Sequence, residues 1–171
     1  MTAEPVYSQA AIGYRSWDVA PDGALRSTGL GGMRWRRGTN VAYCGAGGEH
    51  DAPHALCGCG LYARHDPPVG IEARSPWIAG AVAMRGRVLV HHDGIRAEEA
   101  VIVAIAEPLD PHPADLRRVR AVAERYGVPL VPYAALREEA ARYGAPVPLA
   151  DRPPAPGPVR RRGLLRVLRP R

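Results

Sequence analysis

The chain has no phenylalanine, no lysine and only three cysteines among its 171 residues. An odd number of cysteines, two of them one residue apart, argues against the disulfide framework of a small secreted protein. No apolar run approaches the roughly 18 to 20 residues that cross a bilayer, and the N-terminus lacks the basic start and apolar stretch of a signal peptide. We therefore expect a cytoplasmic protein with reduced thiols and no integral membrane association.

Positive charge is concentrated at one end of the chain. The formal net charge is +6, but residues 151–171 hold seven of the 23 arginines and only one of the 17 acidic residues. Residues 1–150 are formally neutral, with 16 arginines against 16 aspartates and glutamates. The composition therefore does not indicate a basic nucleic-acid-binding surface on the main part of the chain.

The basic tail has three interpretations. Prolines between residues 153 and 158 predict a stiff, unfolded linker, and the arginines beyond it can contact nucleic-acid phosphates without sequence specificity. A short amphipathic helix on an anionic membrane surface and a merely solvated extension are the alternatives. The nucleic-acid hypothesis depends on Arg160, Arg161, Arg162, Arg166 and Arg169.

Most of the chain fits a single domain, because 171 residues can enclose one hydrophobic core of ordinary size. We expect a flexible N-terminus over residues 1–11, an α+β domain over 12–150, and a disordered proline- and arginine-rich tail over 151–171. The expected architecture is an antiparallel, partly closed β-sheet or small barrel with a metal-stapled loop over residues 44–59. Two C-terminal helices are expected to pack on one side of the sheet.

A first β-hairpin is predicted around residues 21–23. The Pro-Asp-Gly sequence there favours a tight turn between strand-like segments over 14–19 and 24–28. The glycine-rich stretch over 29–38 then predicts a loop anchored by Trp35. An indole among arginines can stack on single-stranded nucleic acid, but one aromatic residue makes a poor platform and more often closes a small core.

The region after residue 112 has helical spacing. Pro113 suits a first turn and Gly127 suits a C-terminal cap. A shorter pattern followed by Gly144 predicts a second helix. The apolar positions are Leu116, Val119, Ala123 and Tyr126 in the first helix, and Leu136, Ala140 and Tyr143 in the second.

Four side chains with metal-ligating atoms lie within one glycine-rich segment, namely Cys44, His50, Cys57 and Cys59. Thiolates and imidazoles are good zinc ligands, and three cysteines with one histidine form a standard structural, tetrahedral set. The segment has almost no periodic apolar face, so a metal would help to order it. We expect structural zinc, with iron, a catalytic metal, unliganded thiols and His54 in place of His50 as the open alternatives.

Two motifs extend this pattern. They read Cys-x5-His-x2-Pro-x3-Cys-x-Cys-Gly-x-Tyr-Ala over residues 44–63 and Gly-Arg-Val-x2-His-x2-Gly-x-Arg-Ala-Glu over 86–98. With both motifs, residues 12–132 resemble a group of uncharacterised bacterial proteins, common in actinobacteria. The resemblance implies a small zinc-binding domain and assigns no activity. The matching residues are Cys44, His50, Pro53, Cys57, Cys59, Gly60, Tyr62, Ala63, Gly86, Arg87, Val88, His91, Gly94, Arg96, Ala97 and Glu98.

A second hairpin is predicted at Asp93-Gly94, between an extended segment over 77–92 and a return strand over 95–106. Residues 95–100 also have helical propensity, so a helical turn there is an alternative. A two-residue turn at this dipeptide would place His91 opposite Arg96, with Glu98 on the same face. These three side chains can bind an anion or move a proton, or they can form a structural polar network.

The function that these patterns favour is a non-enzymatic intracellular binding or adaptor domain, with an unidentified protein or nucleic-acid partner. Zinc would hold its loop, and the basic tail would contribute weak contacts with nucleic acid. The first alternative is a metal- or histidine-dependent hydrolase that acts on an acidic substrate through His91, Arg96 and Glu98. The second is a metal or redox sensor that uses the cysteine thiolates.

Overall fold

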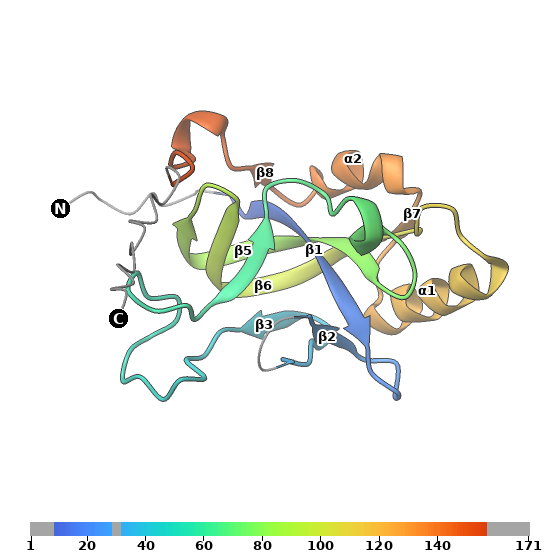
Figure 1. Cartoon of the computed structure of the whole chain (residues 1–171), viewed down its shortest axis with the longest axis horizontal. Helices are drawn as coiled ribbons and strands as arrows, with labels where there is room; N and C mark the ends of the chain where they lie inside the picture. The colour runs from blue at the N-terminus through green and yellow to red at the C-terminus, as the bar shows by residue number, and fades with distance from the viewer. Residues whose placement is uncertain (1–8, 29–31, 157–171) are drawn as a thin grey trace, which may run out of the picture.

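The structure, a computed structural model, describes residues 9–28 and 32–156. Residues 1–8 of the predicted N-terminus and the five arginines proposed to contact nucleic acid lie outside these ranges. The centre of the fold is one long hairpin of β5 (Ile78–Val90) and β6 (Gly94–Ala106), as Figure 1 shows. The alternative of a helical turn over residues 95–100 is wrong, because residues 95–97 pair with strands on both sides.

The turn of this hairpin lies one residue earlier than the sequence predicts. Val90 pairs with Ile95, and the His91 amide donates to the Gly94 carbonyl at 2.8 Å. Residues 92–93 therefore form the turn, and Gly94 already belongs to the strand.

The reason is a close approach of a neighbouring strand. A Cβ atom at Gly94 would lie 2.3 Å from the Ala63 carbonyl oxygen. Glycine is therefore needed at position 94 because the backbone of β6 comes close to that of the segment containing Ala63. It is not needed to form the turn. Leu89, rather than His91, is consequently opposite Arg96 in the ladder.

Four strands close into a ring. β1 (Ala11–Val19) pairs with β5, β5 pairs with β6, β6 pairs with β4 (Leu61–Arg64), and β4 returns to β1. All four of these pairings are antiparallel, whereas β7 and β8 run parallel to their partners. The α+β class and the largely antiparallel sheet are thus as predicted. The other strands are β2 (Leu25–Ser27) and β8 (Ala145–Pro146) beside β1, and β3 (Thr39–Val41) and β7 (Leu130–Val131) beside β6.

Two apolar clusters cover the two faces of β1, because successive side chains of a strand point to opposite sides. Ala11 and Trp17 belong to the first cluster, together with the apolar face of α1 (Pro113–Tyr126). Ile12 and Tyr14 belong to the second cluster, together with α2 (Leu136–Ala140). The prediction that both helices pack on one side is therefore wrong.

The segment between the helices explains the change of face. After α1 the chain forms β7, which pairs with Ile105 and Ala106, the last two residues of β6. It then passes to the other face, where α2 begins at Leu136 after a 3₁₀ turn over Tyr133–Ala135. Further 3₁₀ turns span Gly70–Ala73 and Leu149–Asp151.

The predicted ends of α1 are confirmed. His112 caps its N-terminus by accepting the Ala114 amide at 3.2 Å, and Pro113 is the first helical residue. Gly127 adopts φ 66°, and its amide bonds carbonyls in the last turn, as a C-terminal glycine cap does. The second helix is shorter than predicted, since it ends at Ala140 and leaves Tyr143 beyond it.

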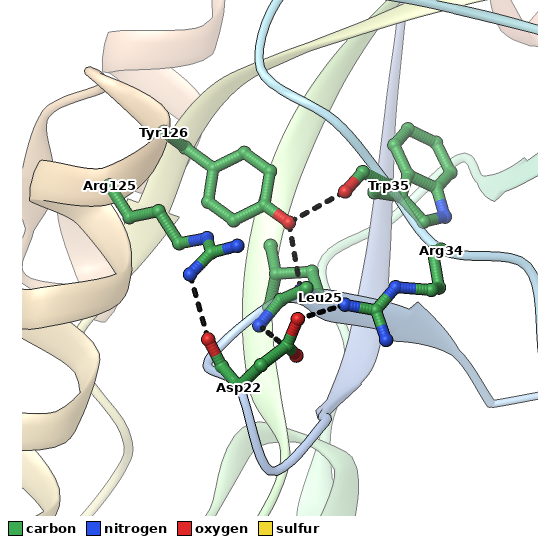
Figure 2. A network of polar contacts seen from close by, with 7 residues as sticks. Asp22, Leu25, Arg34, Trp35, Arg125 and Tyr126 are labelled. Atoms are coloured by element: carbon green, nitrogen blue, oxygen red, sulfur yellow. Dashed lines mark hydrogen bonds and ion pairs between the residues drawn. The ribbon is translucent and has the colours of Figure 1, made fainter.

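A buried tyrosine ties α1 to the first hairpin (Figure 2). The Tyr126 hydroxyl accepts the Leu25 amide at 2.8 Å and donates to the Trp35 carbonyl at 2.8 Å. Next to it, the Arg125 guanidinium donates to the Asp22 carbonyl at 2.7 Å, within the predicted hairpin turn. Trp35 is only 3% exposed, so it closes the core and offers no surface for a base to stack on.

Candidate metal centre

The predicted metal loop interrupts an otherwise continuous strand pairing. β3 ends at Val41, whose partner in β6 is Glu99. β4 begins at Leu61, whose partner in the same strand is Ala97. Residues 43–60 are therefore inserted between two strands that follow one another along β6. In Figure 1 this loop, in blue-green, extends from the end of the sheet opposite α1.

The loop has little core of its own. Ala52 and Pro53 are buried, whereas the other side chains of residues 43–60 are partly or fully exposed. Leu56 is 94% exposed and Tyr43 is 67% exposed. Hydrophobic burial therefore offsets little of the conformational entropy lost in ordering this segment, and a bound metal would help to order it.

The four predicted ligands converge in this loop. One ligand atom from each of Cys44, His50, Cys57 and Cys59 lies within 4.8 Å of every other. The sulfurs of Cys44 and Cys57 are 3.8 Å apart, and the Cys59 sulfur is 3.4 Å from His50 Nε2. All four side chains are partly exposed. This group of side chains can bind a metal ion.

These separations suit a tetrahedral ion of the size of zinc. Bonds of about 2.3 Å to sulfur and about 2.0 to 2.1 Å to nitrogen place two sulfurs about 3.8 Å apart and a sulfur and a nitrogen about 3.6 Å apart. The Cys44–Cys57 and Cys59–His50 separations lie within about 0.2 Å of those values. These two pairs need little rearrangement to admit the ion.

Backbone amides point at two of the sulfurs. The Gly48 amide, and then the Ala46 amide, hydrogen-bond to Cys44 and lower the pKa of its thiol. The Cys59 amide acts in the same direction on Cys57, but hydrogen bonds with the other two thiols, burial and the charge of Cys44 outweigh it and raise the pKa of Cys57. Two neighbouring thiolates repel one another, and a bound cation would remove that repulsion.

Two glycines allow close contacts within the loop. A Cβ atom at Gly48 would lie 2.4 Å from the His50 ring, so a larger residue would displace this ligand. Gly60 has φ 117°, and a Cβ atom there would lie 2.9 Å from Pro53. The neighbouring Gly58 has open space around it and no left-handed backbone. The need for Gly48 could not be recognised from sequence spacing alone.

Arg96 connects the loop to the sheet. Its Nη1 donates to the carbonyl oxygens of Cys57 and Cys59, the latter at 3.0 Å. Its Nε donates to His91 Nε2 at 2.9 Å. Arg96 is only 9% exposed. Three hydrogen bonds therefore fix its nearly buried guanidinium to the backbone of both cysteines and to His91. The structure thus brings His91 and Arg96 together, and it places them beside the metal ligands.

His91 is held as a neutral acceptor. Burial, and then the Arg96 guanidinium, lower the pKa of His91. Its Nε2 lone pair is occupied by the Arg96 N–H, so in this arrangement the nitrogen is not free to accept a proton. The His91 carbonyl in turn accepts a 2.8 Å hydrogen bond from His65, which is 3% exposed.

Glu98 lies elsewhere. The pairing of β5 with β6 shifts between Arg85 and Val88, so that Gly86 and Arg87 together face Glu98 in a β-bulge. The Glu98 carboxylate accepts the Arg87 amide at 3.1 Å. Within the described residues, Glu98 makes no hydrogen bond or ion pair with His91 or Arg96.

Arg87 adds a second connection to the loop. Its Nη1 donates to the Pro53 carbonyl at 3.4 Å, and its Nη2 lies 3.8 Å from the Asp51 carboxylate. The sequence motif contains Arg87 but gives no indication of this role. Arg87 lies within the bulge and reaches the loop from there.

His54 does not replace His50 in the cluster. The two rings lie 4.6 Å apart, and His54 Nδ1 accepts the Leu56 amide at 3.3 Å. The His54 carbonyl also accepts the Cys57 amide at 3.1 Å. This histidine therefore shapes the turn that delivers Cys57.

The arginines of the proposed nucleic-acid contact, residues 160–169, lie outside the described residues. Within the described part of the chain, no helix combines the length and apolar character needed to span a membrane. The one cluster of metal-ligating side chains found in that part is the group formed by Cys44, His50, Cys57 and Cys59. Comparisons with family models, curated proteins and solved structures find no match for this chain.

Proposed function

We propose that the chain is a non-enzymatic binding domain in which a structural zinc ion fixes the loop of residues 43–60 on the sheet. The observation that carries the proposal is the convergence of three sulfurs and one imidazole nitrogen within 4.8 Å. A loop with almost no core needs such a constraint if it is to present a defined surface.

The donor set favours a structural role over a catalytic one. Four protein ligands complete the tetrahedral coordination of zinc and leave no position for a water molecule. Zinc is preferred to iron because three thiolates and a neutral imidazole match its usual structural sites, and because such a site needs no redox change.

The surroundings of the site agree with a non-enzymatic role. The guanidinium of Arg96 is engaged with two backbone carbonyls and with His91, so it is not free to hold a substrate. Glu98 stabilises the bulge instead of orienting His91. The hydrolase alternative would therefore require these contacts to break.

The loop itself supplies the binding surface in this proposal. Tyr43 and Leu56 are exposed, and each directly precedes a ligand cysteine, so the metal would fix the position of both. Ordering two exposed apolar side chains before binding lowers the entropy cost of association. The basic tail would add sequence-independent contacts if the partner is a nucleic acid.

Cobalt substitution tests the closed site. Cobalt(II) bound by the full-length protein should give the intense visible absorption of a tetrahedral thiolate complex, and added cyanide should leave this spectrum unchanged. His50→Ala is the matched control, because removing one protein ligand opens a position that cyanide can occupy. A wild-type spectrum that responds to cyanide as the control does would replace the structural role with a catalytic one.

A thiolate-based sensor is the second candidate. The 3.8 Å separation of the Cys44 and Cys57 sulfurs and their partial exposure favour it, because a peroxide can oxidise two adjacent thiols to a disulfide. Under this hypothesis, equimolar hydrogen peroxide releases the metal rapidly. If the zinc is structural, the protein should instead retain it, and an added free thiol such as glutathione should be oxidised first.

A further inference from the structure

A cleft lies on the molecule at the bulge of β5, apart from the metal ligands. Its volume is about 620 Å³, which falls in the range of ligand-binding pockets. Met84 and Val88, 1% and 5% exposed, contribute apolar side chains to its lining. Arg85, Arg142 and Tyr143 also line it, and no acidic side chain is among the described lining residues.

At the same place, one edge of β5 has no strand partner among the residues that the structure describes. The ladder between β1 and β5 ends at Ala11 and Met84, directly before the bulge. Gln9 and Ala10, which precede β1, line the cleft together with Arg85 and Gly86 and form no ladder with β5. Residues 85–90 of β5 therefore pair with β6 on one side and with no described strand on the other.

An open edge of this kind accepts an added strand. An extended peptide gains main-chain hydrogen bonds from the edge and specificity from pockets that receive alternate side chains. Here the neighbouring side chains are the arginines at positions 85 and 142, of which Arg142 also pairs with Glu139 at 3.1 Å. Guanidinium groups bind carboxylates in a bidentate geometry, so these positions favour acidic residues.

We propose that this cleft binds an extended, acidic peptide segment of a partner protein, which adds a strand to β5 and places carboxylates on Arg85 and Arg142. The proposal deepens the binding function suggested above and names a partner class. It does not require the zinc ion, since the cleft and the ligand cluster share no residue.

A peptide titration tests the proposal. The probe is acetyl-Val-Glu-Val-Glu-Val-Glu-amide, added to the full-length, zinc-supplemented protein and followed by backbone amide chemical shifts. We expect saturable shifts at residues 84–90 and 142–144, with half-saturation below about 1 mM. The same peptide with lysine in place of glutamate should not bind.

Charge reversal supplies the matched control. The double variant Arg85→Glu, Arg142→Glu should bind the acidic peptide at least about tenfold more weakly and should gain binding of the lysine peptide. Equal affinity of wild type and variant for the acidic peptide would overturn the proposal. So would identical shifts with sodium acetate alone, which would show a site for small anions only.

The chain's own N-terminus is the remaining competitor. Nuclear Overhauser contacts between residues 1–8 and Val88 in the free protein would show that the edge is already covered, and would overturn the proposal. Zinc content is measured in every sample. Loss of peptide binding with zinc bound therefore counts against this inference alone, and absence of zinc counts against the structural metal site alone.

Discussion

At the scale of single residues, the proposed metal site depends on Arg96 as well as on its four ligands. A cysteine can be delivered to a metal only if the backbone that carries it is fixed, and Arg96 binds the carbonyls of both Cys57 and Cys59. Groups that orient metal ligands without touching the metal commonly change metal affinity by about 10- to 100-fold when they are removed. We expect Arg96 to be such a positioning residue.

The substitution Arg96→Ala should therefore weaken zinc binding by about 10- to 100-fold, while the protein remains folded. A competition titration against a chromophoric zinc chelator measures the affinity directly. Arg96→Lys should give an intermediate affinity, because an ammonium retains charge but loses the planar set of donors.

Arg85→Ala is the control for this experiment. It removes a guanidinium from the same hairpin, at an exposed position that does not contact the loop. Its zinc affinity should equal that of the wild type. If Arg96→Ala retained wild-type affinity as well, Arg96 would have no positioning role.

At the scale of structural elements, the attachment of α1 to the first hairpin depends on one hydroxyl. Tyr126 is 4% exposed, and its hydroxyl satisfies both a buried amide and a buried carbonyl, those of Leu25 and Trp35. A phenylalanine would leave both groups without a partner. Each unsatisfied buried group costs about 1 to 3 kcal/mol.

Tyr126→Phe should thus lower the free energy of unfolding by about 2 to 6 kcal/mol in urea denaturation. Tyr143→Phe is the matched control, because Tyr143 is 42% exposed and its hydroxyl makes only a 3.5 Å contact with Glu139. Its effect should stay within about 0.5 kcal/mol, as for most surface changes. Equal midpoints for the two variants would show that α1 is held by apolar packing alone.

Local patterns predicted the elements that are determined locally. The Pro-Asp-Gly turn, the caps of α1 and the convergence of three cysteines with His50 all depend on residues close together in the sequence. The register of the β5–β6 hairpin was predicted wrongly, because Gly94 is required by a strand from another part of the chain.

The place of Glu98 shows the same limit. Period-two alternation puts Glu98 on one face with Arg96, but the bulge at Gly86 brings its carboxylate to the Arg87 amide. The placement of α2 on the opposite face from α1 likewise follows from the pairing of β7 with the C-terminal end of β6. Such non-local contacts leave no periodic signal in a single sequence.

At the scale of the whole molecule, the core and the metal site are separate. Most residues of the two apolar clusters come from the strands and helices, and neither cluster includes a residue of the 43–60 loop. The metal is therefore expected to order the loop and not to create the fold. On this proposal the protein would differ from small zinc fingers, which are unfolded without their ion.

Hydrogen exchange of the full-length protein before and after chelation, together with elemental analysis, tests this account most directly. We predict one zinc per chain, and that its removal makes the amides of residues 43–60 exchange fast while those of β5 and β6 keep their protection. Reloading with zinc should restore protection in the loop. A protein that holds no stoichiometric metal, or a loop whose exchange is the same with and without it, would contradict the account.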